Sequence, residues 1–183
     1  MNPLLSTLQP YPFERLRQLF AGVTPPASLP HISLGMGEPR HPTPAFIQEA
    51  MTANLGGLAN YPATAGDIRL RQACADWMGR RYGVQLDAAT QVLPVNGSRE
   101  ALFSFAQTVI DPTRAGATVI CPNPFYQIYE GATLLAGATP YYAASEAARN
   151  FAVNWDAVPE DVWAKTQLIF VCSPGNPTGA VMP

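Results

Sequence analysis

The chain has 183 residues, of which 48% are hydrophobic and 13% are charged, and its formal net charge is -2 at pH 7. This length and apolar content are typical of one globular domain with a sizeable buried core. Since Lys and Arg form no cluster along the chain, the composition argues against nucleic acid and membrane surfaces as partners and favours small, anionic metabolites.

The first residues and the cysteines predict a cytosolic protein without a metal site. The sequence begins without the basic start and apolar run of a secretory signal, and no stretch approaches the roughly 20 apolar residues of a membrane span. Cys74, Cys121 and Cys172 are far apart, odd in number and without nearby His. This pattern argues against both a disulfide framework and a zinc site.

Residues 1–30 predict an N-terminal arm followed by a linker. Apolar side chains recur at helical spacing over 12–21, and the Thr-Pro-Pro run at 24–26 must be extended. We expect residues 31–183 to form one domain. The domain looks incomplete, because the sequence stops at a loop with no helix to cover the last strand.

The next part of the sequence predicts one short strand and two helices. The strand is expected at 31–34, and the first helix begins where Thr43 and Pro44 can cap and start it. The second helix is expected over 67–82 and ends at Gly83. The apolar side chains expected to face inward are Phe46, Ile47, Ala50 and Met51 in the first helix and Leu70, Ala73, Cys74, Trp77 and Met78 in the second.

From residue 91 onward, apolar strands alternate with helices. Such alternation predicts an α/β domain around a mostly parallel sheet with flanking helices. The strands are expected at 92–95, 118–121, 140–143 and 168–172, and the helices at 98–110, 127–135 and 159–165.

The turn from the strand at 92–95 into the next helix has features of a phosphate site. Gly97 lets a ligand approach the backbone closely, Ser98 can cap the helix and bond a phosphate oxygen, and Arg99 supplies positive charge from the first helical turn. An ordinary capped helix start carries the same residue types, so this motif alone leaves both interpretations open.

Two further segments follow strands at the edge where open α/β sheets bind their ligands. In residues 173–179 (SPGNPTG), two prolines fix the backbone and expose Asn176, whose amide can donate a hydrogen bond to a phenolate or carbonyl oxygen. A tight Pro/Gly turn is the alternative. In residues 121–129 (CPNPFYQIY), prolines position aromatic side chains that either stack on a planar ligand or belong to the core.

These three segments, in this order, resemble fold-type I pyridoxal-phosphate enzymes of the class I/II aminotransferase family. Residues 35–39 (GMGEP) are similar to the family's early G-E-P stretch, and residues 60–62 with 66–71 are similar to its Y-P-x-x-G…L-R segment. The resemblance covers nearly the whole chain. It implies the large domain of a fold-type I PLP transferase, incomplete and preceded by an N-terminal arm.

The resemblance implies a site for pyridoxal 5'-phosphate made from all three segments. Gly97, Ser98 and Arg99 would meet the cofactor phosphate. Tyr126 would stack on the pyridine ring, and Asn176 would bond the 3-oxygen of that ring.

Two residues outside these segments are implied as well. The backbone of Gly37 would lie against the substrate carboxylate. Tyr61 would reach the cofactor phosphate of the neighbouring subunit, because enzymes of this family are homodimers with shared sites. Phe125 departs from the family pattern, since many relatives carry a small residue there, and Tyr126 is taken as the stacking ring.

The implied reaction moves an amino group between an amino acid, with glutamate as the donor, and a 2-oxo acid. Residues 37–44, 97–103 and 123–126 look most like bacterial succinyldiaminopimelate aminotransferases of lysine biosynthesis. These enzymes need a lysine that forms a Schiff base with the cofactor, and in the family it follows the N-P-T-G loop by several dozen residues. It would lie beyond position 183, and Lys165 cannot be matched to it. We therefore expect no catalytic residue within this stretch and no activity of the stretch alone.

Three other interpretations stay open. Gly35-x-Gly37 after a strand suggests a nicotinamide-dependent dehydrogenase, but the third glycine is missing and Pro39 interrupts the helix that should follow. Another fold-type I enzyme, such as a carbon–sulfur lyase, would share every motif quoted. An inactive truncated remnant or an aminotransferase-like regulator is the non-enzymatic alternative, and no helix-turn-helix segment precedes the motifs to favour the regulator.

Overall fold

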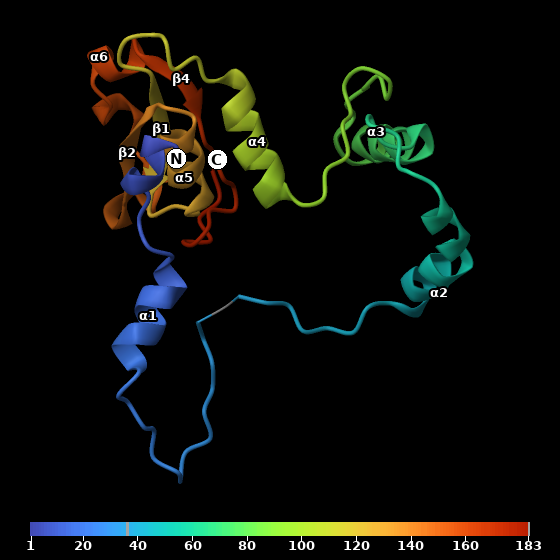
Figure 1. Cartoon of the computed structure of the whole chain (residues 1–183), viewed down its shortest axis with the longest axis horizontal. Helices are drawn as coiled ribbons and strands as arrows, with labels where there is room; N and C mark the ends of the chain where they lie inside the picture. The colour runs from blue at the N-terminus through green and yellow to red at the C-terminus, as the bar shows by residue number, and fades with distance from the viewer. Residues whose placement is uncertain (36, 183) are drawn as a thin grey trace. The chain divides into compact units, whose positions relative to one another are not determined.

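The computed structural model describes residues 1–35 and 37–182 (Figure 1). The chain divides into two compact units. One unit is Pro12–Pro94, and the other combines Met1–Tyr11 with Val95–Pro183. Among the described residues, no helix has the length and apolarity needed to cross a bilayer.

The Pro12–Pro94 unit is helical. Its described helices are α1 (Pro12–Phe20), α2 (Ala45–Ala53), a short 3-10 helix (Leu55–Ala59) and α3 (Ile68–Tyr82). α3 begins where the Asp67 carboxylate accepts a hydrogen bond from the backbone N–H of Arg69 at 2.8 Å. It ends at Gly83, whose φ of 69° lies in the left-handed region that favours glycine. The helices predicted in this half are confirmed.

Arg71 on α3 holds the segment that follows the helix. Its guanidinium donates hydrogen bonds to the backbone carbonyl oxygens of Val92, at 3.0 Å, and of Ala89. The carboxylate of Asp87 accepts a hydrogen bond from the N–H of Ala89 at 2.9 Å. One arginine thereby fixes the path along which the chain leaves the unit.

Two expectations for this unit are wrong. Residues 31–34 form no strand, and the apolar faces of α2 and α3 are largely exposed, with relative exposures of 70% for Phe46 and 49% for Trp77. A strand exists only through hydrogen bonds to a neighbouring strand, and an amphipathic face is buried only where another element packs on it. The buried apolar side chains described in this unit are Ala75 and Ala88.

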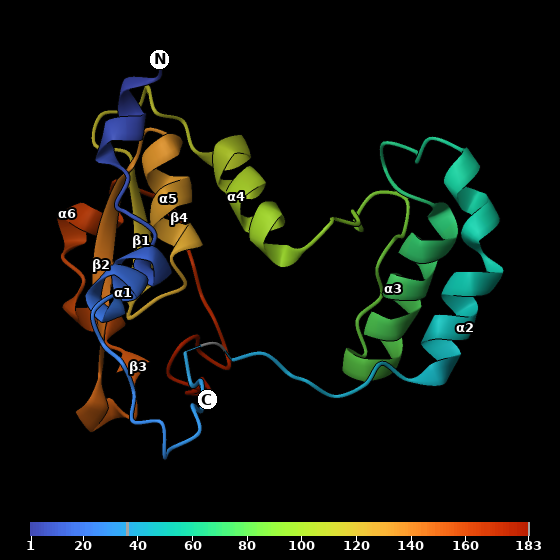
Figure 2. The same ribbon diagram turned by 60° about the horizontal axis from the view of Figure 1, so that its bottom comes forward.

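The second unit is built on a sheet whose described strands follow the order β3-β2-β1-β4 (Figure 2). The strands are β1 (Thr118–Asn123), β2 (Thr139–Glu146), β3 (Ala152–Val153) and β4 (Thr166–Ile169). β1 runs parallel to β2 and β4, whereas β3 pairs antiparallel with β2. The predicted, mostly parallel sheet is confirmed. β3 was not predicted, because two residues are too few to show the alternation of apolar and polar residues that is typical of a strand.

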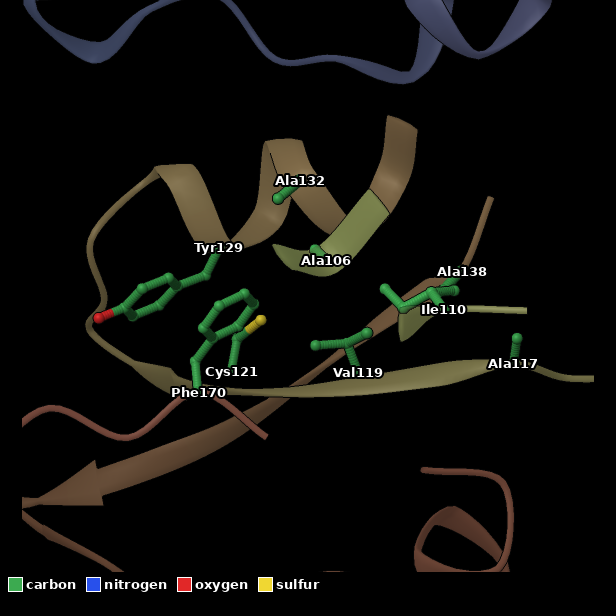
Figure 3. Packing of buried hydrophobic residues seen from close by; sticks show 9 residues of the cluster. All are labelled: Ala106, Ile110, Ala117, Val119, Cys121, Tyr129, Ala132, Ala138 and Phe170. Carbon is green, nitrogen blue, oxygen red and sulfur yellow. The ribbon is translucent and has the colours of Figure 1, made fainter. Parts of the chain in front are cut away.

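Successive side chains of β1 point to opposite faces of the sheet, and different helices cover the two faces. The helices are α4 (Ser98–Val109) and α5 (Ile128–Leu135) on one face and α6 (Glu160–Trp163) on the other. The larger core lies under α4 and α5 (Figure 3) and contains Ala106, Ile110, Ala117, Val119, Cys121, Tyr129, Ala132, Ala138 and Phe170. Ile120, Ala143 and Val158 form the smaller core on the opposite face.

Two strand predictions in this unit need correction. Residues 92–95 pair with none of the described strands, and 67% of Leu93 is exposed. β4 ends at Ile169 and not at Cys172. The next ladder bond from β1 would have to come from Pro122, which has no backbone N–H, so the pairing stops there.

Candidate functional site

Three predicted segments lie toward one end of the second unit. β1 and β4 are parallel neighbours. The N–H of Phe170, just after β4, donates to the carbonyl oxygen of Ile120 in β1 at 3.0 Å, and the segments that follow the two strands leave the sheet at the same edge. α4 runs back toward the start of β1, so its first turn also lies toward this edge (Figures 1 and 2). The carboxyl edge of the sheet thus gathers the segments that carry Ser98, Tyr126 and Asn176.

The start of α4 presents free backbone donors. The first intrahelical hydrogen bond runs from the N–H of Ala101 to the carbonyl oxygen of Gly97 at 3.2 Å, so the three preceding N–H groups have no acceptor within the helix. Gly97 has a φ of 120°, which side chains rarely adopt, and a Cβ there would lie 2.9 Å from Oε2 of Glu100. The turn therefore has the free backbone donors that an anion needs.

The side chains of this turn add one positive and one negative group. Gly97, not Ser98, is the N-cap residue, and the predicted capping bond from the Ser98 hydroxyl is not made. Arg99 is exposed and has no hydrogen bond or ion pair with the described residues. The carboxylate of Glu100 lies beside Gly97, where it complements the positive end of the helix but opposes an incoming anion.

Tyr126 follows β1 in a loop of aromatic side chains. Its ring is half-buried and meets Tyr129 edge-on, with centroids 6.0 Å apart and an interplanar angle of 83°. Phe125 instead stacks on Tyr142 at 5.5 Å and 13°. Because Phe125 is already stacked on a protein ring, Tyr126 is the better placed of the two to face a ligand.

Asn176 lies in a loop held by its own backbone. The N–H of Gly175 donates to the carbonyl oxygen of Ala180 at 2.8 Å, and the N–H of Gly179 donates to that of Gly175 at 2.7 Å. The Ser173–Pro174 and Asn176–Pro177 peptide bonds are cis. The Asn176 side chain is exposed and makes no hydrogen bond with the described residues, so its amide is free to donate to a ligand.

A cavity of about 330 Å³ opens beside this loop, and Asn176 is the predicted site residue that lines it. Val153 and Trp155, which pack against the smaller core, also line it. Tyr126 packs against the larger core on the other face of the sheet. The cavity therefore does not join the Tyr126 ring to the Asn176 amide.

Gly37 and Tyr61 belong to the Pro12–Pro94 unit. Both are exposed, and apart from the chain neighbours of Gly37, none of the described residues has an atom within 4 Å of the position that a Cβ on Gly37 would take. Met36, which is part of the predicted G-M-G-E-P motif, lies outside the described residues.

Lys165 lies at the opposite edge of the sheet. It directly precedes β4, and its Nζ pairs with Asp161 at 3.2 Å. Its side chain also lies against Gly116, which precedes β1. The amino ends of parallel strands are one strand length away from their carboxyl ends, so this amine is remote from Asn176.

One residue of this edge was missed at the sequence level. Tyr129 is buried and meets the Tyr126 ring edge-on. It also stacks on Phe170 at 4.3 Å (Figure 3). The available signal was the three-residue spacing of Tyr126 and Tyr129, on either side of the point where the helix at 127–135 was expected to begin. No group of His, Cys, Asp and Glu suited to a metal ion occurs among residues 1–35 and 37–182.

The sequence profile of the aminotransferase class I and II family matches residues 30–183. The LL-diaminopimelate aminotransferase of Desulforudis audaxviator (strain MP104C) is 38% identical over 179 residues, which cover 97% of this chain and 45% of the relative. The LL-diaminopimelate aminotransferase of Aquifex aeolicus (strain VF5) is 39% identical over 151 residues, which cover 81% of this chain and 38% of the relative. The chain thus spans about half the length, or less, of the curated relatives it matches.

Solved structures are similar along the whole chain. An aminotransferase from Neisseria meningitidis Z2491 is 50% identical with a TM-score of 0.93, covering 100% of this chain and 47% of that one. Aminotransferase AspB from Helicobacter pylori 26695 is 35% identical with a TM-score of 0.86, covering 96% of this chain and 45% of that one. The fold is therefore part of the large domain of a fold-type I aminotransferase, as predicted.

Proposed function

Because the chain belongs to the class I and II aminotransferase family, we propose that it forms the cofactor-binding part of a pyridoxal-phosphate-dependent aminotransferase. The family uses pyridoxal phosphate. The observation that carries the proposal is that the first turn of α4 and the loops with Tyr126 and Asn176 lie toward one end of a parallel sheet. Open α/β sheets bind their ligands at this end.

The residues of this edge suit the three parts of the cofactor. We assign the phosphate to the free N–H groups of the first α4 turn, the Ser98 hydroxyl and the Arg99 guanidinium. Tyr126 would stack on the ring, and the Asn176 amide would donate to the 3-oxygen. Bound there, pyridoxal phosphate supplies an electron sink that lets an amino acid give up its α-proton and its amino group.

These residues bind and orient, and none of them is placed to move the proton. Lys165 is the one lysine in the sequence, and it lies at the amino edge of the sheet in an ion pair with Asp161. For the 183-residue chain alone, we therefore infer cofactor binding without turnover.

We propose a diaminopimelate derivative as the amino-acid substrate, with glutamate and its 2-oxo acid as the other pair. The relatives named LL-diaminopimelate aminotransferases support this choice. The resemblance to succinyldiaminopimelate enzymes rests on segments such as residues 97–103. The two candidates share the diaminopimelate carbon chain and differ by an N-succinyl group, so both belong in the assay.

We also propose a homodimer with shared sites, in the cytosol. In it, residues 1–30 form an arm and linker ahead of the 31–183 domain, Gly37 lies against the substrate carboxylate and Tyr61 reaches the partner's phosphate. The exposure of Tyr61 is compatible with a contact outside its own subunit. Three free cysteines support a reducing compartment.

The binding test uses pyridoxamine 5'-phosphate, which has no aldehyde and cannot react with Lys165. Calorimetric titration of the full chain should show one site, and Arg99→Gln should weaken binding at least about tenfold, since it removes a charge-assisted contact. Arg114→Gln is the matched control, because Arg114 is also exposed but precedes β1 at the other edge of the sheet. Equal affinities of the two variants would remove the phosphate assignment.

The activity test uses the product of the complete reading frame that encodes these residues. We expect it to transfer an amino group from glutamate in reactions that interconvert diaminopimelate or its N-succinyl derivative with the matching 2-oxo acid. Release of ammonia or sulfide without a transferred amino group would instead identify a lyase. Cofactor binding without any turnover would favour an inactive remnant.

A further inference from the structure

Tyr129 is the side chain at which two of the proposed cofactor segments meet. It lies in the first turn of α5, and only 4% of it is exposed. Its ring stacks on Phe170 with centroids 4.3 Å apart and planes 8° from parallel (Figure 3). Tyr126 also meets the Tyr129 ring, edge-on and with centroids 6.0 Å apart. One ring therefore supports the loop after β1 and the chain after β4 together.

Cys172 belongs to this second segment. Its thiol donates to the carbonyl oxygen of Pro174 at 3.2 Å. Burial raises the pKa of Tyr129 to about 12, and the neighbourhood of Cys172 acts in the same direction. The phenol therefore keeps its proton at neutral pH.

We propose that Tyr129 is a positioning residue that couples the Tyr126 ring to the 170–176 segment carrying Asn176. This inference rests on the proposed function, in which Tyr126 and Asn176 touch the cofactor. A stacking ring works best at a fixed tilt, and the edge-on contact with Tyr129 supports one side of the Tyr126 ring. Tyr129 is in turn held by Phe170 and by the core under α5.

Two replacements separate this role from that of an ordinary core aromatic. Tyr129→Phe keeps both ring contacts and removes only the hydroxyl group, whereas Tyr129→Leu removes the ring contacts as well. Tyr142→Leu is the matched control. Tyr142 is also a tyrosine of this unit with a ring stacked on Phe125 and a hydroxyl that donates to Glu130, but it belongs to a separate ring pair.

The experiment measures three quantities on the full chain. These are the affinity for pyridoxamine 5'-phosphate, the rate at which iodoacetamide alkylates Cys172 without ligand, resolved by peptide mass spectrometry, and the midpoint of thermal unfolding. We expect Tyr129→Leu to weaken binding about tenfold or more and Tyr129→Phe by less than about threefold. Tyr129→Leu should speed alkylation of Cys172, because it removes the stack on Phe170. Tyr142→Leu should lower the midpoint and change neither binding nor alkylation.

The proposal is overturned if Tyr129→Leu keeps both the affinity and the Cys172 alkylation rate of the parent chain. It is also overturned if Tyr142→Leu loses as much affinity as Tyr129→Leu at an equal loss of thermal midpoint. If the parent chain does not bind the ligand, the proposed function fails. The alkylation rates, measured without ligand, then still decide whether Tyr129 holds the 170–176 segment.

Discussion

Gly97 occupies a backbone conformation that other residues avoid, with φ at 120°. Gly97→Ala would bring a Cβ to 2.9 Å from Oε2 of Glu100, and backbone strain of this kind costs on the order of 1–3 kcal/mol. We expect the free energy of unfolding in urea to fall by about that amount. Gly131→Ala is the control, because Gly131 lies inside α5 and a Cβ there would have no atom within 4 Å apart from the neighbouring backbone of the helix. Equal losses in both variants would mean that the conformation of Gly97 is not required.

Glu100 places a negative charge beside the turn to which we assign the phosphate. Removal of this negative charge near the helix N-terminus should make the binding free energy of an anion more favourable by about 0.3–1 kcal/mol. Glu100→Gln should therefore bind pyridoxamine 5'-phosphate about two- to fivefold more tightly in calorimetric titration. Glu160→Gln, in the first turn of α6, should bind it as the parent does. Unchanged affinity in Glu100→Gln would place the phosphate away from this turn.

At the scale of elements, Arg71 ties α3 to the segment that follows it. Lysine has one ammonium group in place of the flat guanidinium, so Arg71→Lys cannot keep both bonds to the carbonyl oxygens of Val92 and Ala89. We expect the free energy of unfolding of the Pro12–Pro94 unit to fall by about 1–2 kcal/mol. Arg80→Lys, on the exposed side of the same helix, should change it by less than about 0.5 kcal/mol. Circular dichroism in urea measures both.

The N-terminus of α3 should respond to acid through Asp67. Hydrogen bonds from the side chain and backbone of Arg69 lower the pKa of Asp67 from 3.8 to about 2. A carboxylate with a lowered pKa stabilises the fold at pH values above its unfolded pKa, and this contribution is lost as the pH falls through the folded value. Asp67→Asn keeps a capping oxygen but cannot titrate. The helical stability of the parent chain should thus exceed that of Asp67→Asn at neutral pH, and the excess should vanish between about pH 4 and pH 2. A constant difference would show that the Arg69 contacts are not formed.

Local signals predicted the elements well, and burial poorly. Asp67 and Gly83 mark the ends of α3, and the glycine before Ser98 marks the start of α4, because caps depend on a few neighbouring residues. The expectations of a strand at 92–95 and of a buried face on α2 were wrong, because each depends on a partner surface that the local pattern does not contain. The spacing of apolar residues along a helix or strand shows which of its sides is apolar, but it does not show which other element packs on that side.

The same contrast between local signals and contacts with distant parts of the chain applies to the candidate site. Strand-end loops and helix starts can be read from the sequence, and the parallel sheet then brings the segments of Ser98, Tyr126 and Asn176 toward one edge. Tyr129 could not be assigned in this way, because its role depends on a stack with Phe170, which lies 41 positions later in the chain. Contacts across such separations are set by strand register, which the sequence does not display.

At the scale of the whole molecule, the exposed apolar side chains of α2 provide a test of the proposed homodimer. Phe46 and Met51 have relative exposures of 70% and 66%, and exposed large apolar side chains are frequent in protein interfaces. We expect the full chain to sediment as a dimer whose population rises with concentration. Phe46→Glu should shift it to monomer, because it would bury a charge in the interface. Glu49→Gln, at a polar position of the same helix, should leave the dimer intact. A monomer at every concentration would contradict the proposed homodimer, and dimers that survive Phe46→Glu would place the interface on another face.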